Sequence, residues 1–591
     1  MKRKLALILA VLFVLALFAG CANGDSKTGS KTGSESSGSS TGSEASSGGE
    51  SSGSESSGGD TTPADEGPYK FALGKYAKDD EGWPLEKYEY ELPLSTTDET
   101  FTNMTLSFLP QYLPEDGYAE LPMYQGREDK TGVHMEYMLI STAAYQETLS
   151  TQEATDDLPD VIAGFWSYHT GSTLSECIDD EIIANIYDYK DYAPNYCRWY
   201  KDYEWIDNMK GNVNLPTETK WIAMVDFYDE PCQTTGYFMR GDWLDELGLA
   251  AYDANTYDDW YDQLMAMKVA GYCEFPLQVY SYIDAYGNVW NGFNTAPYTE
   301  SCLYLRAIDG EVSMTGMTED DLVLAQYLNK WYTDGILSPN FQAMSDIDAI
   351  TLDTVNNGNG CSFYNPSEIA GIEAQCIDPD ARFDVMKKLV CNEGDIIHWH
   401  LDPDEFGGTG SSIAGSCDNI ELVVTWMDWA YSPEGVEWTN FGPQGIYWDY
   451  DEGGNRYWLD IMTSFEWGIG WAVMEYLQSP MDSGVNSFTR NYINPESRRL
   501  WTFFEVWNES MDYYDGAYNY PGSLHLDDDA SSEVNQLRSD ADTFFAENYV
   551  QFILGNKSFS EWDAFQSQLR DMGMGRVVEI YQEAYDDYMA A

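Results

Sequence analysis

The apolar positions of the chain follow two periods in turn, which predicts strands and helices in alternation. Residues Phe101–Leu109 alternate loosely and are rich in strand-forming side chains, and a second such stretch ends near Ile140. Residues Leu158–Gly164 are a short apolar run bounded by a turn, which is typical of a buried parallel strand. Helical signals cover residues 120–130 and 142–152 between these runs. This alternation predicts an α/β fold.

Helix start signals recur farther along the chain. Thr256 and Asp259 have the spacing of a capping box, and Thr318 and Asp321 repeat it before a helix that should stop at Gly335. The last helix should present one apolar face, because its apolar side chains recur at helical spacing. The residues of this face are Val577, Ile580, Tyr581, Ala584, Tyr585 and Tyr588.

The first residues have the pattern of a secretory signal, with a basic start at Met1–Lys4 and a charge-free run over Leu5–Gly20. The run ends in Leu17–Cys21, which resembles the lipobox of bacterial lipoproteins, with Phe18 where that family prefers Leu. The resemblance implies a signal peptide over residues 1–20 and a lipid on the Cys21 thiol. An ordinary cleavage site with an incidental cysteine is the alternative. No later segment reaches 18 apolar residues, so no membrane span is predicted.

Residues 21–68 are predicted to be a flexible tether. Between residues 22 and 62 the chain is almost entirely Ser, Gly, Thr and Glu, without an aromatic residue, Leu, Ile or Val. Such a composition cannot bury enough apolar surface to order itself. A coil of about 40 residues has a reach of about 35 Å. Signal, lipid anchor and tether together predict a body held at the outer face of the bacterial cytoplasmic membrane.

Length and charge restrict the classes of function. With 591 residues the chain is too long for one hydrophobic core, so at least two lobes are expected. A net charge of −69 argues against binding to nucleic acid and to bare anionic lipid. Five histidines and ten cysteines are too few for a His- or Cys-rich metal enzyme. The cysteines after Cys21 show no C-x-x-C spacing, so most should be small buried side chains, and their pairing stays open.

Several blocks of the sequence resemble the extracellular solute-binding proteins of ABC importers, in the group that includes oligosaccharide binders. Residues Tyr237–Leu249, with the sequence YFMRGDWLDELGL, and Thr256–Trp260 form one such block. The other blocks follow in the same order as in that family, and together they cover nearly all of the chain after about residue 97. They are Thr131–Met135, Leu158–Gly164, Trp426–Trp429, Ser432–Gly435, Phe441–Gly445, Phe552–Gly555 and Tyr581–Tyr585.

The resemblance implies a type II periplasmic-binding-protein fold, with two discontinuous lobes, a hinge and a ligand cleft. Lobe one is expected over residues 97–230 plus 404–525, and lobe two over 231–403 plus 526–591. Such a protein captures a small solute, here expected to be an oligosaccharide, by lobe closure and delivers it to the ABC transporter permease subunits. It is expected to be a monomer that needs no cofactor and catalyses no reaction.

Aromatic side chains are the best candidates for ligand contacts, because sugar rings stack on aromatic faces. The chain has 20 Trp, 44 Tyr and 24 Phe, most of which must be core. In open α/β sheets, ligands bind at loops that follow strands. The resemblance implies a stacking Trp at Trp166, after the strand 158–164, and an aromatic residue at Tyr364, after a second strand. With residues near the expected hinge crossings, the predicted ligand-binding set is Trp166, Tyr168, Tyr228, Tyr364, Trp399 and Tyr520.

Two other functions stay open at this stage. A receptor for a peptide or another non-sugar solute would share the fold. A secreted glycan hydrolase would need two carboxylates about 5–10 Å apart, but 100 acidic residues make any such pair uninformative. After residue 97 the sequence contains no G-x-S-x-G, H-E-x-x-H or G-x-x-x-x-G-K-[ST] motif, so an enzyme is not predicted.

Two clusters could hold a metal ion, and neither is predicted to do so. His398 and His400 stand at i and i+2 of an expected strand, with Asp402 or Asp404 as further ligands. A polar strand near the hinge explains the same residues. The acidic run 527–529 lacks the spaced pattern of a calcium-binding loop, so a solvated loop is expected there.

Overall fold

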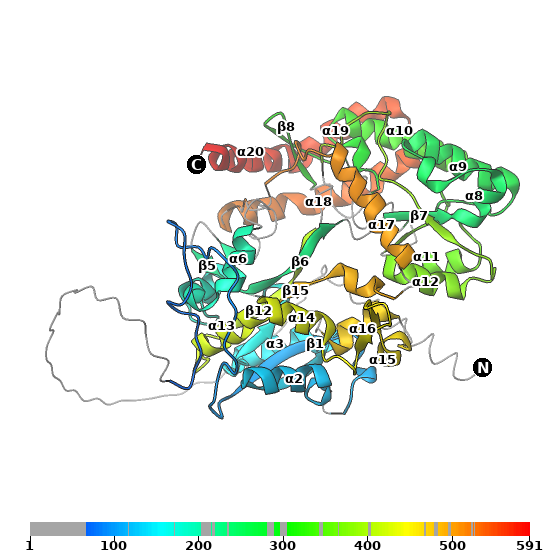
Figure 1. Ribbon diagram of the computed structural model, residues 1–591. Helices are drawn as coiled ribbons and strands as arrows, with labels where there is room; N and C mark the ends of the chain where they lie inside the picture. Colours follow the sequence, from blue (N-terminus) through cyan, green and yellow to red (C-terminus); the bar gives the residue numbers. More distant parts are fainter. Residues whose placement is uncertain are drawn as a thin grey trace, which may run out of the picture.

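The computed structural model describes most of the chain after residue 66, and Figure 1 shows two lobes. Cys21 and most of the tether lie outside the described residues, as do His400, Asp402 and Asp527. Within the described ranges, no helix is both long enough and apolar enough to cross a membrane. These ranges are 67–115, 117–170, 172–202, 214–215, 219–232, 236–279, 289–295, 304–341, 347–364, 366–399, 404–465, 468–477, 483–494, 498–521, 524, 526 and 528–590.

A mixed six-stranded sheet is the centre of the lower lobe in Figure 1, which we call the first lobe. Its strand order is β15-β6-β12-β3-β1-β2. β1 is parallel to β2 and β3, β12 is antiparallel to β3 and β6, and β15 is parallel to β6. The three strands expected near the start of the folded chain are confirmed as β1, β2 and β3. The sheet consists of β1 (Thr100–Ser107), β2 (His134–Ser141), β3 (Val161–Ala163), β6 (Met224–Cys232), β12 (Asp404–Ile413) and β15 (Val485–Asn486).

Helices pack on this sheet around an aromatic core that includes Tyr196, Trp221, Phe227 and Trp429, all buried. The two helices expected over residues 120–130 and 142–152 are confirmed as α2 and α3. The helices of this lobe are α2 (Pro122–Thr131), α3 (Thr142–Thr155), α4 (Phe165–Tyr168), α5 (Leu174–Asp179), α6 (Pro194–Asp202), α13 (Ile420–Trp429), α14 (Pro433–Phe441), α15 (Asp460–Thr463) and α16 (Ile469–Tyr476).

Residues 67–96 pack along the first lobe, although no sequence pattern assigned them to an element. Trp83 packs against the core of that lobe. The Tyr90 hydroxyl donates to Asp428 Oδ2 at 2.7 Å, and the same carboxylate accepts from the Tyr196 amide at 2.6 Å. Burial raises the pKa of Asp428 to about 7. Residues 67–96 are therefore bound to the core of the first lobe.

A three-stranded antiparallel sheet with β7 in its middle is the centre of the upper lobe in Figure 1, the second lobe. Trp260, Trp290 and Trp331 are completely buried in its core. Its strands are β7 (Gly236–Arg240), β10 (Cys361–Tyr364) and β11 (Phe383–Val385), with a hairpin of β8 (Leu305–Ile308) and β9 (Glu311–Met314). Its helices are α8 (Gly241–Leu247), α9 (Tyr257–Ala270), α10 (Glu319–Thr333), α11 (Ile347–Val355), α12 (Pro366–Gln375), α18 (Asp528–Ile553), α19 (Trp562–Leu569) and α20 (Gly575–Ala590).

Both expected capping boxes are formed in the second lobe. The Thr256 amide donates to Asp259 Oδ2 at 2.9 Å, and the Thr256 side chain accepts from the Asp259 amide. At the start of α10, the Thr318 amide donates to Asp321 Oδ2 at 2.7 Å, and Gly335 follows the helix with a φ of 71°. A cap of this kind contributes about 1 kcal/mol. The expected apolar face of the last helix lies on α20, and the first two residues of this face, Val577 and Ile580, are buried.

The acidic run at 527–529 differs from the expectation. Asp528 and Asp529 belong to the first turn of α18 and not to a solvated loop. Acidic residues are favourable in the first turn of a helix because of the helix dipole, a preference that the loop prediction overlooked.

The cysteines of the described residues agree with the expectation for small buried side chains. Cys177, Cys197, Cys273, Cys361 and Cys417 are free and buried. Burial raises the pKa of these thiols, so they stay protonated at neutral pH.

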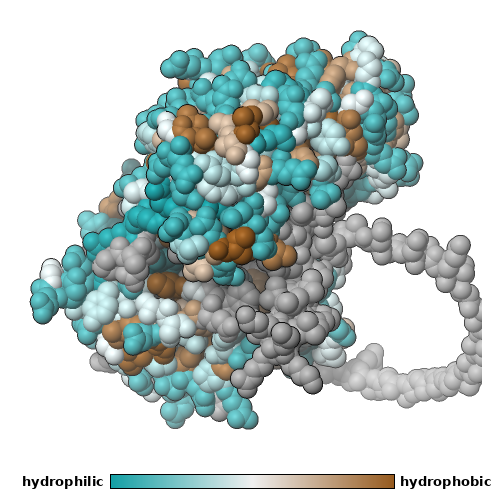
Figure 2. Space-filling model, turned by 90° about the vertical axis from the view of Figure 1, so that its right-hand side faces the viewer, coloured by the Kyte–Doolittle hydropathy of each residue, from teal (hydrophilic) through white to brown (hydrophobic). Residues whose placement is uncertain are grey.

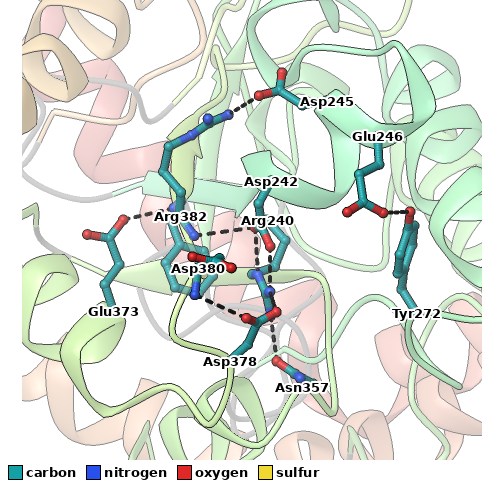
Figure 3. Close-up of polar contacts among 11 residues, drawn as sticks. Arg240, Asp242, Asp245, Glu246, Tyr272, Asn357, Glu373, Asp378, Asp380 and Arg382 are labelled. Atoms are coloured by element: carbon teal, nitrogen blue, oxygen red, sulfur yellow. Dashed lines mark hydrogen bonds and ion pairs between the residues drawn. The ribbon is translucent and has the colours of Figure 1, made fainter.

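Figure 3 shows the charge network that the RGDW sequence builds where β7 runs into α8. The guanidinium of Arg240 is completely buried and donates two hydrogen bonds to Asp242, at 2.8 and 2.6 Å. It also donates to Asn357 at 2.6 Å and to Asp378 at 3.1 Å. Arg240 also lies over the Trp243 ring at 4.0 Å. The network joins the β7–α8 turn to the segments that follow α11 and α12.

The helix α17 (Arg498–Asn508) belongs to a smaller core cluster that joins both of the lobes predicted from the sequence. Phe503, Phe504 and Trp507 of this helix pack with Phe238 and Phe383 of the second-lobe sheet. The predicted end of lobe one at residue 525 therefore stays a prediction.

Candidate functional site

Five parallel strands of the first-lobe sheet point toward one edge. β1 is parallel to β2, and β12 is antiparallel to both β3 and β6, so β1, β2, β3, β6 and β15 all point the same way. In Figure 1, β6 extends from this sheet toward the second lobe. Open α/β sheets bind ligands at the carboxyl ends of their strands, so we take this carboxyl edge as the candidate site.

Polar side chains gather at the carboxyl end of β15 and along the neighbouring first two thirds of β6. Arg490 follows β15 on a 3-10 helix, η10 (Phe488–Tyr492), and donates to Asn440 Oδ1 at 2.5 Å and to Asn486 Oδ1 at 3.1 Å. The side-chain amide of Asn486 in turn donates to Asp226 Oδ2 at 2.8 Å. Burial lowers the pKa of Arg490 to about 10, which leaves it charged at neutral pH.

Two residues of β6 complete this polar group: Tyr228, which was predicted to bind the ligand, and its neighbour Asp229. Tyr228 is half-buried and pairs with Asn486 in the parallel register of β6 and β15. Asp229 follows it, and its buried Oδ1 has no hydrogen-bond partner within the described ranges. The negative charges of Asp229 and Asp226 oppose the lowering of the Arg490 pKa. The combination of guanidinium, carboxylate, amide and phenol is suited to ligand hydroxyl groups.

A second polar group at the same edge was missed by the sequence analysis. Glu475 of α16 is completely buried at the end of β1, where it accepts from Ser107 Oγ at 2.7 Å and from the Leu109 amide at 3.0 Å. Burial raises the pKa of Glu475. Beside it, the half-buried Phe108 lies edge-on to Trp471 at 6.0 Å. Phe108 directly follows β1, but the sequence pattern placed it inside a strand that ends at Leu109, so the rule that selected Trp166 did not select it.

Trp166 lies after β3, as expected, but on the helical turn α4 and not in a loop. Gly164 explains the difference, because its φ of 65° lets the chain turn directly from strand to helix. Trp166 is half-buried and packs against the first-lobe core. Tyr168, on the same turn, packs against Tyr145 with ring centroids 4.8 Å apart. Their contact with a ligand stays a prediction.

The remaining predicted aromatic residues lie in the second lobe or next to it. Trp399 is 3% exposed and donates its indole N–H to the Leu305 carbonyl at 3.2 Å. The Tyr520 hydroxyl donates to the Tyr581 carbonyl of α20 at 3.0 Å. Tyr364 is the last residue of β10, so it belongs to the strand that it was expected to follow. Their binding roles stay predictions.

Within the described ranges no strand is formed at His398 and Trp399, and His400 lies outside those ranges. Only Ile397 makes a bridge, with Tyr514, and His398 lies beyond it outside any strand. His398 Nδ1 is 2.8 Å from Asp515 Oδ1. Asp404 is the first residue of β12. The described residues contain no group of three side chains placed to hold a metal ion.

A thiol, an imidazole and a carboxylate come together behind α4, which the sequence analysis did not foresee. His169 Nδ1 is 2.5 Å from Glu153 Oε1, and His169 Nε2 is 3.4 Å from Cys177 Sγ. Cys177 is completely buried and its pKa is raised by burial, so no solute reaches a reactive thiolate here. These contacts fix the connection from α4 to α5.

The sheet order, the two lobes and the strand that connects them define the fold of the periplasmic solute-binding proteins, which confirms the fold predicted from the sequence. No protein-family model matches the chain. An HMO-binding solute-binding protein from Bifidobacterium longum infantis aligns with 83% of this chain and 99% of its own, at 16% identity and a TM-score of 0.64. The substrate-binding protein FusA of Streptococcus pneumoniae, in complex with kestose, aligns with 83% and 100%, at 18% identity and a TM-score of 0.58.

A curated relative agrees with these structures. The fructooligosaccharide ABC transporter substrate-binding protein FusA of Streptococcus pneumoniae is 22% identical over 180 residues, which are 29% of this chain. The matched region spans about a third, 32%, of that relative. At these identities the likeness shows the fold.

Proposed function

We propose that the protein is an extracytoplasmic receptor that captures an oligosaccharide and delivers it to an ABC importer. The observation that carries this proposal is the likeness of 83% of the chain to a solved HMO-binding solute-binding protein, at a TM-score of 0.64. FusA supports the same class of solute by its bound kestose. Aromatic rings and hydroxyl-binding groups at the carboxyl edge suit a sugar.

The proposed mechanism is closure of the lobes around the solute, without chemical turnover. The proposed lobes are residues 97–230 plus 404–525 and residues 231–403 plus 526–591. The extension of β6 toward the second lobe supports a hinge there. The proposed contacts are Trp166, Tyr168, Tyr228, Tyr364, Trp399 and Tyr520.

Binding of a cognate oligosaccharide should stabilise the protein, because a solute that binds only the folded state shifts the unfolding equilibrium. At a concentration of 100 Kd the gain should be about 2.7 kcal/mol. A thermal-shift screen against soluble glycans and peptides measures it. Stabilisation by peptides alone would replace the sugar with the non-sugar alternative, and a glycan recovered in cleaved form would point to a hydrolase.

We also propose a lipid anchor at Cys21, with the tether 21–68 between the membrane and the body. The body would then act as a monomer at the outer face of the cytoplasmic membrane, next to its permease subunits. Replacing Cys21 with Ser should move the protein from the membrane fraction to the soluble fraction or leave the precursor uncut. A Ser variant that is processed and retained like the parent would contradict the anchor.

A further inference from the structure

A shallow groove of about 570 Å³ lies on the first lobe, beside the connection from β14 (Arg456–Trp458) to α15. β14 pairs with β13 (Trp448–Tyr450) in a hairpin. Figure 1 shows α15 and α16 at the lower right, and Figure 2 turns this side toward the viewer and shows hydrophobic patches on both its upper and its lower part. The groove is lined by Tyr457, Trp458, Asp460, Ile461, Thr463 and Asn494.

The side chains of the groove offer the two kinds of surface that a sugar needs. Tyr457 is half-buried, and Ile461 is 43% exposed, so a ring and an aliphatic chain are both accessible. The carboxylate of Asp460 and the hydroxyl of Thr463 are exposed beside them. Apolar faces can pack on the C–H side of a sugar ring, while the oxygen atoms pair with its hydroxyl groups.

The floor of the groove is held rigid by hydrogen bonds. Trp458 is 2% exposed, and its backbone amide donates to Asn494 Oδ1 at 2.8 Å. Its indole N–H donates to the Arg490 carbonyl at 2.7 Å. A floor that is already ordered costs little conformational entropy when a solute binds.

The charges around the groove disfavour an anionic occupant. Asp449, Asp451 and Asp460 belong to the same hairpin and its continuation. The arginine of this hairpin, Arg456, is already paired with Glu437 and lies 4.3 Å over the Phe441 ring. An anionic sugar would therefore meet carboxylates, with the neighbouring guanidinium already committed elsewhere.

The groove and the carboxyl edge share one structural element. Arg490 binds Asn486 at the end of β15 through its guanidinium and accepts from the groove floor through its carbonyl. The element that carries it, η10, has five residues and is therefore about 10 Å long. We propose that the groove is an outer subsite for a neutral sugar unit of a long oligosaccharide whose end is held at the carboxyl edge. This inference rests on the proposed function.

The test measures, by calorimetry on the full-length protein, the binding of short and long oligosaccharides from the same neutral glycan. The glycans are inulin-type fructans, maltodextrins, mannans and xylans. Tyr457→Ala should weaken binding of the long member about tenfold, or 1.4 kcal/mol, and leave the short member unchanged. Tyr450→Ala is the matched control, because Tyr450 is 46% exposed on the same hairpin but does not line the groove. It should change neither affinity.

Each other outcome overturns the subsite in a distinguishable way. Equal binding of long glycans by the parent and Tyr457→Ala removes the groove but keeps the receptor. Equal losses for short and long glycans would show that Tyr457 acts through the main site or through folding, which a melting curve of the variant separates. If no neutral glycan of the panel binds the parent, the proposed function fails and the subsite fails with it.

Discussion

Replacing Asp321 with Ala should lower the free energy of unfolding by about 3–5 kcal/mol, because the change leaves a buried guanidinium without its counter-charge. Arg306 is completely buried and donates to both carboxylate oxygens of Asp321, at 3.1 and 3.0 Å. Asp321 is only 1% exposed and also accepts from Thr295 and from the Thr318 amide. The Asp321 carboxylate therefore both caps α10 and forms an ion pair with Arg306 of β8.

Urea titration measures this loss, with the slope m as a check on the compactness of the denatured state. Asp202→Ala is the matched control, since Asp202 pairs with Arg198 one helical turn away and the two side chains are 39% and 31% exposed. An exposed pair of this kind contributes about 0.3–0.5 kcal/mol. If Asp321→Ala costs no more than the control, the buried pair is not a major contribution to the stability of the second lobe.

Replacing Trp166 with Ala should weaken oligosaccharide binding by about 2–4 kcal/mol, which is about 30- to 1000-fold. The side chain is half-buried at the carboxyl end of β3, so one part of the ring packs on the core and another part is accessible. A sugar ring stacked there would lose its main apolar contact.

Affinity and melting temperature must be measured together, because part of the ring is core. Trp438→Ala is the control: Trp438 is half-buried on α14 and donates its indole N–H to the Met123 carbonyl of α2 at 3.1 Å. It should lower the melting temperature and leave affinity unchanged. A Trp166→Ala variant that behaves in the same way would place Trp166 in the core and remove it from the ligand site.

The features that the sequence could predict are those set by neighbours along the chain. The strands β1 to β3, the helices α2 and α3 and the capping boxes at Thr256 and Thr318 depend on spacings of a few residues. The loop at Trp166 was predicted as irregular because a single Gly164 in the left-handed region decides between a loop and a helical turn.

The polar groups of the candidate site could not be predicted in the same way, because their partners are far apart in sequence. Asn486 reaches Asp226 across 260 positions, and Glu475 reaches Ser107 across 368. No periodicity records such a pair, and with 100 acidic residues the choice of one carboxylate is arbitrary without the fold. The aromatic positions were selected by a rule for loops that follow strands, yet Tyr228 and Tyr364 lie within β6 and β10.

The attachment of residues 67–96 has a mechanical consequence for a two-lobed molecule. These residues are bound within the first lobe, through contacts such as those of Trp83 with the core and of Tyr90 with Asp428. Under the proposed anchor, a pull through the proposed tether is therefore applied to the first lobe alone and exerts no torque across the proposed hinge. In the proposed receptor the second lobe moves against the first, and the free energy of the proposed closure is independent of tension in the proposed tether.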